Sequence, residues 1–202
     1  MTGRLLLASR NPHKLEELRR ILVGVAGLEV VGLGDVPPFP EAPETEPTFE
    51  GNALAKARDA AAATGLPAVA DDSGLAVDAL NGMPGVLSAR WSGLARDDAA
   101  NVRLLLEQLA DVPDGRRGAR FVSAAALVVP GGPETVVRGE WPGTVTRAPR
   151  GTNGFGYDPV FVPEGLAITS AEMSPAEKDA VSHRGRSLRA LLPALQDLAA
   201  RS

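Results

Sequence analysis

The order of short apolar runs and helices constrains the fold of this chain most strongly. The run 4–9 is apolar enough for a buried strand. Asn11-Pro12 follows it and is typical of a helix start, with Asn as the N-cap and Pro at the first helical position. We expect this helix to reach about Val23, and a second strand to occupy 28–33. The chain therefore begins as strand, helix, strand.

The rest of the chain continues this alternation. We expect an acidic, proline-rich loop over 35–48, a helix over 52–64, a buried strand over 67–71, a helix over 97–110, a hairpin of 121–129 and 134–141, a further strand over 143–147, a helix from Ser174, and a last helix over 187–200 that Pro193 kinks or breaks. This order is typical of an α/β protein with a mixed sheet.

Composition excludes several classes of protein. The chain has 202 residues, which suits one domain or two lobes around one cleft. Its net charge of −4 disfavours a general nucleic-acid binder. The absence of cysteine excludes disulfides and Cys-ligated metals. The apolar run near the N-terminus is too short for a signal peptide or a membrane span, so we expect a soluble cytoplasmic protein.

The segment Ser9 to Lys14 is the first candidate site. A helix N-terminus offers free N–H groups and a positive dipole end to an anion, and Lys14 adds a point charge suited to phosphate. The segment lacks the glycines and the GK[ST] ending of a Walker A loop. The alternative is a capped helix with an exposed lysine, and these residues alone leave both interpretations open.

Asp71 and Asp72 follow an apolar run directly. Adjacent carboxylates repel each other unless a cation or hydrogen bonds offset the charge, and neighbours in an extended segment face opposite sides. A Mg²⁺ site is the natural use of such oxygens, and a carboxylate beside Mg²⁺ can orient or deprotonate a water. The alternative is an Asp-Ser-Gly turn that ends the strand.

The run 151–159, GTNGFGYDP, combines glycines with aromatic rings. Glycines allow close approach of the backbone to a ligand, and the faces of Phe155 and Tyr157 could stack on a nucleobase. Taken alone, this motif favours the alternative of a tight loop whose rings pack into the core.

A fourth candidate lies near the C-terminus. Lys178 and Ser182 share a helix face by spacing, and we expect His183 and Arg184 at the end of that helix, before Gly185. The functional interpretation is a cluster of hydrogen-bond donors. The alternative is a pair of cations that complement the helix dipole.

Three weaker candidates lie earlier in the chain. Glu41 and Glu44, on the proline-rich loop, could reach a cation, although a solvated loop is the simpler interpretation. Lys56, on the alanine-rich helix, is interpreted as a surface residue, with a phosphate contact as the alternative.

Taken together, these segments resemble the noncanonical purine nucleoside-triphosphate pyrophosphatases (dITP/XTP pyrophosphatase, inosine triphosphatase-like). The matching segments, in order, are ASRNPHK, TFEGNALAKA, ADDSGLAVDALNGMPGVLSARWSG, GTNGFGYDPVF and EKDAVSHRG. The resemblance extends from Leu5 to about Leu195. It implies one two-lobed domain over 1–202, in which a mixed β-sheet with flanking helices surrounds a central substrate cleft.

The resemblance also implies an activity and a set of site residues. It implies hydrolysis of ITP, dITP and XTP to the monophosphate and pyrophosphate, Mg²⁺ as cofactor, and a homodimer that binds neither nucleic acid nor membrane. Asp72 would bind Mg²⁺ and accept a proton from the attacking water, and we choose Glu44 over Glu41 as the second metal ligand. The implied substrate contacts are Ser9, Arg10, Asn11, Pro12, His13 and Lys14 for the triphosphate, Ser73, then Phe155, Gly156, Tyr157 and Asp158 for the nucleoside, and Lys178, His183 and Arg184 for the base and nearby atoms.

The chain departs from the family pattern at three positions. Asn153 and Glu46 stand where the family usually has glycine, and we expect both to change loop geometry only. Gly51 replaces a common Glu before Asn52. Together with Glu46, this change leaves the metal ligand on the acidic loop open.

Other functions remain possible on the sequence alone. A Maf-like nucleotide pyrophosphatase would share the triphosphate chemistry but not GFGYDP or SHRG. A catalytically silent nucleotide-binding module is disfavoured by the intact Asp72, Lys14 and Lys178. Nucleic-acid binding is the weakest option, given the net charge.

Overall fold

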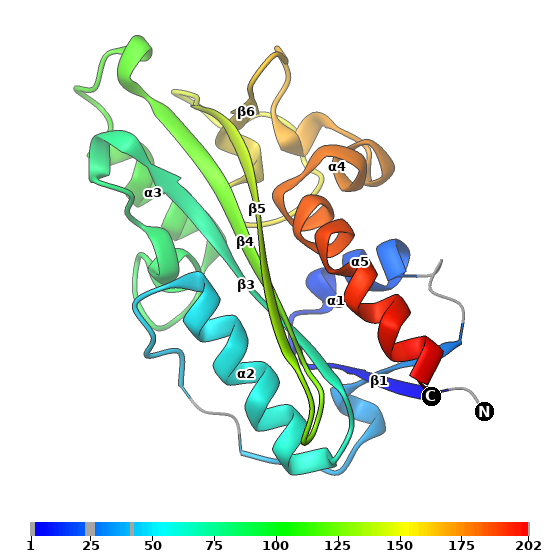
Figure 1. The fold of residues 1–202 in the computed structure, drawn as a ribbon. Helices are drawn as coiled ribbons and strands as arrows, with labels where there is room; N and C mark the ends of the chain where they lie inside the picture. Colours follow the sequence, from blue (N-terminus) through cyan, green and yellow to red (C-terminus); the bar gives the residue numbers. More distant parts are fainter. Residues whose placement is uncertain (1–2, 23–26, 41–42, 202) are drawn as a thin grey trace. The chain divides into compact units, whose positions relative to one another are not determined.

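The computed structural model describes residues 3–22, 27–40 and 43–201. The strands are β1 (Gly3–Leu7), β2 (Leu28–Gly32), β3 (Ala68–Val77), β4 (Gly118–Val128), β5 (Glu134–Val145) and β6 (Phe161–Pro163). The helices are α1 (Pro12–Leu22), α2 (Phe49–Thr64), α3 (Asp98–Gln108), α4 (Pro175–Val181) and α5 (His183–Arg201). Figure 1 shows these elements along the chain.

The six strands form one sheet in the order β2-β1-β3-β4-β5-β6. Strand β1 pairs in parallel with β2 and β3, whereas β5 and β6 are antiparallel. The sheet is therefore mixed and carries flanking helices, which confirms the predicted α/β class. The central substrate cleft stays a prediction.

The chain divides into two compact units. Unit 1 comprises Met1–Asp72, Ser123–Gly139 and Arg184–Ser202, and unit 2 comprises Ser73–Val122 and Glu140–His183. The chain passes from one unit to the other within β3, β4 and β5, and at the peptide bond between His183 and Arg184. That the whole chain acts as one two-lobed domain stays a prediction.

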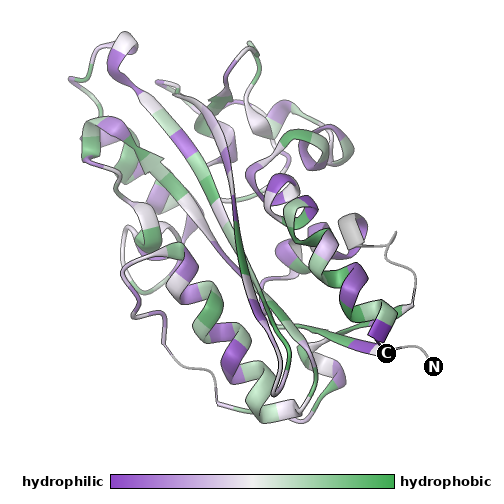
Figure 2. Cartoon of the chain, in the orientation of Figure 1, coloured by the Kyte–Doolittle hydropathy of each residue, from purple (hydrophilic) through white to green (hydrophobic). Residues whose placement is uncertain are grey.

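The core of unit 1 lies on both faces of its strands. Leu5 and Leu7 point to one face, where they pack with leucines of α5, including Leu188 and Leu191. The helix α2 lies on the opposite side of these strands (Figure 1), and its buried alanines let it pack closely. Hydrophobic and hydrophilic residues alternate along α2 and α5 in Figure 2, as expected for helices with one buried face.

In the core of unit 2, α3 packs against those parts of β3, β4 and β5 that belong to this unit. Leu105 of α3 and Leu109, which directly follows this helix, cluster with aromatic residues, including Trp141 and Phe161. The buried guanidinium of Arg117 donates to three backbone carbonyls, at Leu109, Val145 and Thr146, over 2.6 to 2.8 Å. Arg117 thereby connects the residue that follows α3 to the end of β5, which precedes the glycine-rich run 151–159.

Several predicted boundaries are wrong, each for a local reason. Strand β3 does not end at Asp71 but continues to Val77, because Gly74 leaves room for Ser88, whose Oγ would lie 2.3 Å from an added Cβ. The predicted separate strand 143–147 is instead the end of β5. Helix α2 begins at Phe49 rather than Asn52, because Thr48 caps it by accepting a hydrogen bond from the Gly51 N–H.

The C-terminal helices also differ from the prediction. His183 and Arg184 do not end a helix. They form the first turn of α5, because α4 ends at Val181 and Ser182 has an extended backbone. Helix α5 continues through Pro193 without a break. The predicted end of the first helix at Val23 lies outside the described residues, and none of the helices within the described ranges has the length and hydropathy that crossing a membrane requires.

Candidate active site

Two residues of α2 hold the carboxylate of Asp72 in unit 1. Asn52 Nδ2 donates to Asp72 Oδ2 at 3.1 Å, and Lys56 Nζ lies 3.0 Å from Oδ1. The Asp72 side chain is only 8% exposed, and this burial raises its pKa, while the nearby charge of Lys56 opposes the shift. Asp72 is therefore a fixed carboxylate with an elevated proton affinity, as a proton acceptor requires.

Glu44 converges on the same lysine. Lys56 Nζ lies 2.5 Å from Glu44 Oε1, so one ammonium group bridges the two predicted metal ligands. Burial lowers the pKa of Lys56, but the charges of Asp72 and Glu44 outweigh this effect and raise it overall. The interpretation of Lys56 as a surface residue is wrong. Its side chain is 22% exposed and forms ion pairs with both carboxylates.

These carboxylates fit a divalent cation. Within the described residues, no group of three or more His, Asp or Glu side chains could hold a metal ion. Mg²⁺, however, commonly takes only one or two carboxylates from a protein and completes its shell with water and substrate phosphates. Glu44 and Asp72 supply this donor set, and Lys56 shows that a positive charge is stabilised between them. Glu41, the alternative ligand, lies outside the described residues.

Asp71 belongs to a different cluster, made of buried charges. Its Oδ2 lies 3.0 Å from Lys14 Nζ and 3.3 Å from Arg184 Nε, and Arg184 Nη1 also forms an ion pair with Glu17. Burial raises the pKa of Asp71, but Lys14 and Arg184 outweigh this effect and hold it well below its usual value. Asp71 contacts residues of α1 and α5 whereas Asp72 contacts α2, so the adjacent carboxylates serve different faces of β3.

The segment Ser9 to Lys14 forms the predicted cap of α1. Asn11 Oδ1 accepts from the Lys14 N–H at 3.4 Å, and Ser9 Oγ accepts from the Asn11 N–H at 3.3 Å. Arg10 and Pro12 are exposed. The Lys14 side chain is only 14% exposed, and this burial lowers its pKa. The alternative of an exposed lysine is therefore wrong. The side chain of His13 lies outside the described part of the structure.

Asp158 organises the glycine-rich loop of unit 2. Its carboxylate accepts from the Phe155 N–H at 2.9 Å, from Ser170 Oγ at 2.8 Å and from Lys178 Nζ at 2.6 Å. Gly154 has a φ of +75°, and a Cβ there would lie 2.0 Å from Asp158 Oδ2, so only glycine fits. Lys178 Nζ also lies 5.4 Å from the centre of the Phe155 ring, within cation–π range.

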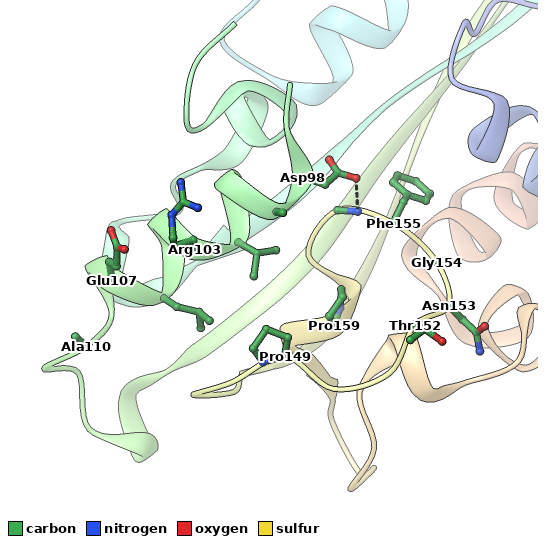
Figure 3. Close-up of a pocket in the computed structure, with 14 residues that line it drawn as sticks. Asp98, Arg103, Glu107, Ala110, Pro149, Thr152, Asn153, Gly154, Phe155 and Pro159 are labelled. Atoms are coloured by element: carbon green, nitrogen blue, oxygen red, sulfur yellow. Dashed lines mark hydrogen bonds between the residues drawn. The ribbon is translucent and has the colours of Figure 1, made fainter. Parts of the chain in front are cut away.

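The two aromatic residues of the loop have different surroundings. Tyr157 is buried, and its hydroxyl donates to the Ser88 carbonyl at 2.9 Å, so the core-packing alternative holds for this ring. Burial raises the pKa of Tyr157 well above its usual value. Phe155 is only half-buried. The Gly156 N–H, between them, donates to Asp98 Oδ2 at 2.8 Å, as the dashed line in Figure 3 shows.

Two further predicted contacts lie in unit 2. His183 is buried, and its ring stacks on Phe121 with centroids 4.8 Å apart and an interplanar angle of 11°. Ser73, directly after Asp72, is half-buried. His183 thus belongs to the core of unit 2, whereas its neighbour Arg184 belongs to the charge cluster of unit 1.

A cavity of about 750 Å³ lies beside the loop in unit 2, between the loop and α3 (Figure 3). It is lined by Asp98, Ala99, Val102, Arg103, Leu106, Glu107, Ala110, Pro149, Thr152, Asn153, Gly154, Phe155, Gly156 and Pro159.

Sequence reasoning missed several residues of these sites. Asn52 lies one helical turn before Lys56, for which the sequence predicts a surface position, and this spacing could have placed both side chains on one face of the helix. Glu17 is similarly close to Lys14 on α1. Ser88 and Asp98 carry no local signal, because their roles depend on contacts with a loop far along the chain.

Comparison with known proteins gives consistent matches along the chain. The Ham1 family model matches residues 5–194. A relative from Nocardia farcinica named dITP/XTP pyrophosphatase is 74% identical over 202 residues, covering 99% of this chain and 98% of the relative. A relative of the same name from Mycobacterium tuberculosis is 70% identical over 201 residues, covering 98% of each chain.

Solved structures agree with this match. A Mycobacterium abscessus structure titled nucleoside-triphosphatase / dITP/XTP pyrophosphatase is 65% identical, with a TM-score of 0.78 over 95% of this chain and 99% of that one. A HAM1 protein from Coxiella burnetii is 41% identical, with a TM-score of 0.86 over 96% and 99% of the two chains. On sequence and structure alike, the chain belongs to the Ham1 family.

Proposed function

We propose that the protein hydrolyses ITP, dITP and XTP to the monophosphate and pyrophosphate, and so removes these nucleotides from the cellular pool. The observation that carries the proposal is the full-length identity to relatives named dITP/XTP pyrophosphatase. The site geometry supports it, because unit 1 contains a carboxylate pair suited to a divalent cation and a lysine at a helix N-terminus.

We assign the triphosphate to the residues of unit 1. The positive end of the helix dipole at the N-terminus of α1 and the buried ammonium of Lys14 both favour an anion at the segment Ser9 to Lys14. Asp72 and Glu44 would hold Mg²⁺. Mg²⁺, when bound, neutralises the charge that develops on phosphate oxygens.

In this assignment the proton acceptor is Asp72. Its carboxylate, oriented by Asn52 and Lys56, takes a proton from a water that attacks the α-phosphorus. The bond from the α-phosphorus to the bridging oxygen breaks, and pyrophosphate leaves. Lys14 and the N-terminus of α1 stabilise the charge on that leaving group. Positioning and electrostatics supply most of the rate acceleration.

We assign the nucleoside to the residues of unit 2. Phe155 presents a half-buried ring to the base, and the backbone of Gly156 allows close approach. The buried Tyr157 and Asp158 hold the loop in shape, and Ser73, Lys178 and His183 complete the set. We also propose Arg184 as the donor to the 6-oxygen of the base.

Arginine donates hydrogen bonds but cannot accept them. Hypoxanthine and xanthine carry an oxygen at position 6, which Arg184 would satisfy. The 6-amino group of adenine would instead face another donor, and an unpaired buried donor costs about 1–3 kcal/mol. This difference would favour ITP and XTP over ATP.

Further parts of the proposal concern setting and assembly. We propose a homodimer that acts in the cytoplasm and binds neither nucleic acid nor membrane. The relatives named dITP/XTP pyrophosphatase favour purine triphosphates over the substrates of a Maf-like enzyme. Light scattering after gel filtration tests the dimer, and salt-dependent binding to DNA or RNA would contradict the exclusion of nucleic acid.

Product analysis tests the proposed activity. The protein is incubated with Mg²⁺ and ITP, XTP, GTP or ATP in separate reactions, and the nucleotides are resolved by ion exchange. We expect IMP or XMP with pyrophosphate, and little GMP or AMP. IDP with phosphate would place the attack at the γ-phosphorus. Tight binding of ITP without turnover would favour a silent binding module.

A further inference from the structure

Asn153 is the residue of the loop that departs from the family pattern, and the structure gives its side chain a partner. Its Nδ2 donates to the Met173 carbonyl at 3.0 Å, and its backbone N–H donates to the Ala171 carbonyl at 2.9 Å. A glycine at this position would keep the backbone bond and lose the side-chain bond. Asn153 therefore adds a link between the loop and the segment that leads into α4.

A second link joins the same two segments. Lys178 and Asp158 form an ion pair across 20 residues of sequence, the same separation as between Asn153 and Met173. The two links enclose the loop residues 154–157, which include the half-buried ring of Phe155. They also enclose the first three residues of α4 on the other segment. The aromatic part of the loop is thus held at both ends against one short helix.

The helix start between these links is itself well ordered by hydrogen bonds. Ser174 caps α4, because its side chain accepts from the Glu177 N–H at 3.3 Å, and the Glu177 carboxylate accepts in return from the Ser174 N–H at 2.8 Å. A capping box of this kind fixes the backbone of the first turn. Met173, whose carbonyl accepts from Asn153, directly precedes this N-cap, and α4 carries Lys178.

We propose that Asn153 is a positioning residue for nucleoside recognition, and that its side chain fixes the loop that carries Phe155 relative to Lys178. The inference rests on the proposed function, because it takes Phe155 and Lys178 as nucleoside contacts. Asn153 acts through these residues and takes no part in the cleavage step. Its loss should therefore raise KM for a nucleotide and leave kcat unchanged.

Two substitutions isolate the side-chain donor. Asn153→Ala removes the hydrogen bond. Asn153→Asp keeps the shape of the side chain but replaces the donor by a carboxylate, which only accepts and would face the Met173 carbonyl. We expect KM for ITP to rise about fivefold in Asn153→Ala, the effect of one neutral hydrogen bond, and to rise further in Asn153→Asp. We expect kcat to stay within about twofold.

Inorganic triphosphate separates nucleoside recognition from phosphate binding, since it carries no base or sugar. Its inhibition constant against ITP hydrolysis should be the same in the wild type and both variants. Gln108→Ala is the matched control, because it also removes one side-chain amide from a hydrogen bond in unit 2, the one from Trp91 Nε1. This control should leave KM for ITP unchanged.

Hydrogen exchange tests the link without reference to activity. Amide exchange in peptides that cover 151–158 and 173–178 should be faster in Asn153→Asp than in the wild type or Gln108→Ala, since opening of the loop becomes easier. Unchanged exchange, or a fall in kcat with no change in KM, would overturn the inference. If the wild type fails to hydrolyse ITP, the proposed function is wrong, and the exchange experiment still decides whether Asn153 holds the loop.

Discussion

The polar sites of the two units are built by different means. Unit 1 gathers buried or half-buried charges of both signs, namely Lys14, Lys56 and Arg184 with Glu17, Glu44, Asp71 and Asp72. The loop of unit 2 depends on one buried ion pair, Lys178 with Asp158, together with glycine geometry and hydrogen bonds to the backbone. The first arrangement suits a polyanion and a cation, whereas the second presents a shaped surface with an aromatic ring.

The largest effect is expected from Asp72→Asn. The amide keeps the size of the side chain but cannot accept a proton, so kcat for ITP should fall at least about a thousandfold. The free energy of unfolding should change little, because the raised pKa of Asp72 shows that burying its charge opposes folding, whereas the new NH2 group would face a donor, Asn52 Nδ2 or Lys56 Nζ. Steady-state kinetics and thermal unfolding measure the two quantities. Asp114→Asn, an exposed carboxylate in unit 2, is the control. A variant with activity within tenfold of the wild type would remove Asp72 from the chemistry.

Arg184→Ala should have the second largest effect, and the largest on stability. It leaves the buried Asp71 and Glu17 without their shared cation, which costs about 3–5 kcal/mol of unfolding free energy. The preference for ITP over ATP should narrow by about 5- to 150-fold, if Arg184 also donates to the base. Denaturant unfolding and kinetics with both nucleotides distinguish these roles. A large loss of stability with an unchanged preference would make Arg184 purely structural.

A change in pH should act on unit 1 through Lys14. Burial lowers the pKa of Lys14, and the opposing charge of Asp71 only partly offsets this effect. As the pH rises, Lys14 therefore loses the charge that holds phosphate at a lower pH than an ordinary lysine, whose pKa is 10.5. Asp71→Asn removes the opposing charge and lowers the pKa further. The alkaline rise of KM for ITP should therefore begin at a lower pH in Asp71→Asn than in the wild type. Coincident KM profiles would show that Lys14 does not bind substrate through its charge.

The smallest effect is expected at an exposed ion pair. Arg138 Nη1 lies 2.7 Å from Glu50 Oε1, but both side chains are more than a third exposed. Solvent screens such pairs, so Arg138→Ala should shift the unfolding midpoint by less than about 2 °C. Differential scanning fluorimetry measures this shift. A larger shift would mean that charge at the surface also stabilises unit 1, and the contrast with the buried cluster would weaken.

The sequence predicted the α/β class and the cap of α1, because both depend on local patterns. The predicted boundaries of elements are wrong where contacts with distant residues determine them. Strand β3, for example, continues beyond Asp71 because Gly74 leaves room for Ser88.

The site residues show the same contrast between features that local patterns predict and features that depend on distant contacts. The segments around Asp72 and Phe155 stand out by composition, so both were found as candidates. Lys56 is predicted at the surface, although it pairs with Glu44 on another segment. Asp98 is not predicted at all, because its partner, the Gly156 N–H, lies far along the chain. Charged residues on a helix can face solvent or a buried carboxylate, and spacing alone does not choose between these environments.

The most direct test of the division between the two units is inhibition by inorganic triphosphate. Lys14→Met and Lys178→Met each remove one lysine, from unit 1 and from unit 2. If unit 1 binds the phosphates and unit 2 the nucleoside, Lys14→Met weakens inhibition of ITP hydrolysis by triphosphate at least about tenfold, and Lys178→Met raises KM for ITP while the inhibition constant stays unchanged. Equal weakening of triphosphate inhibition in both variants would contradict this account.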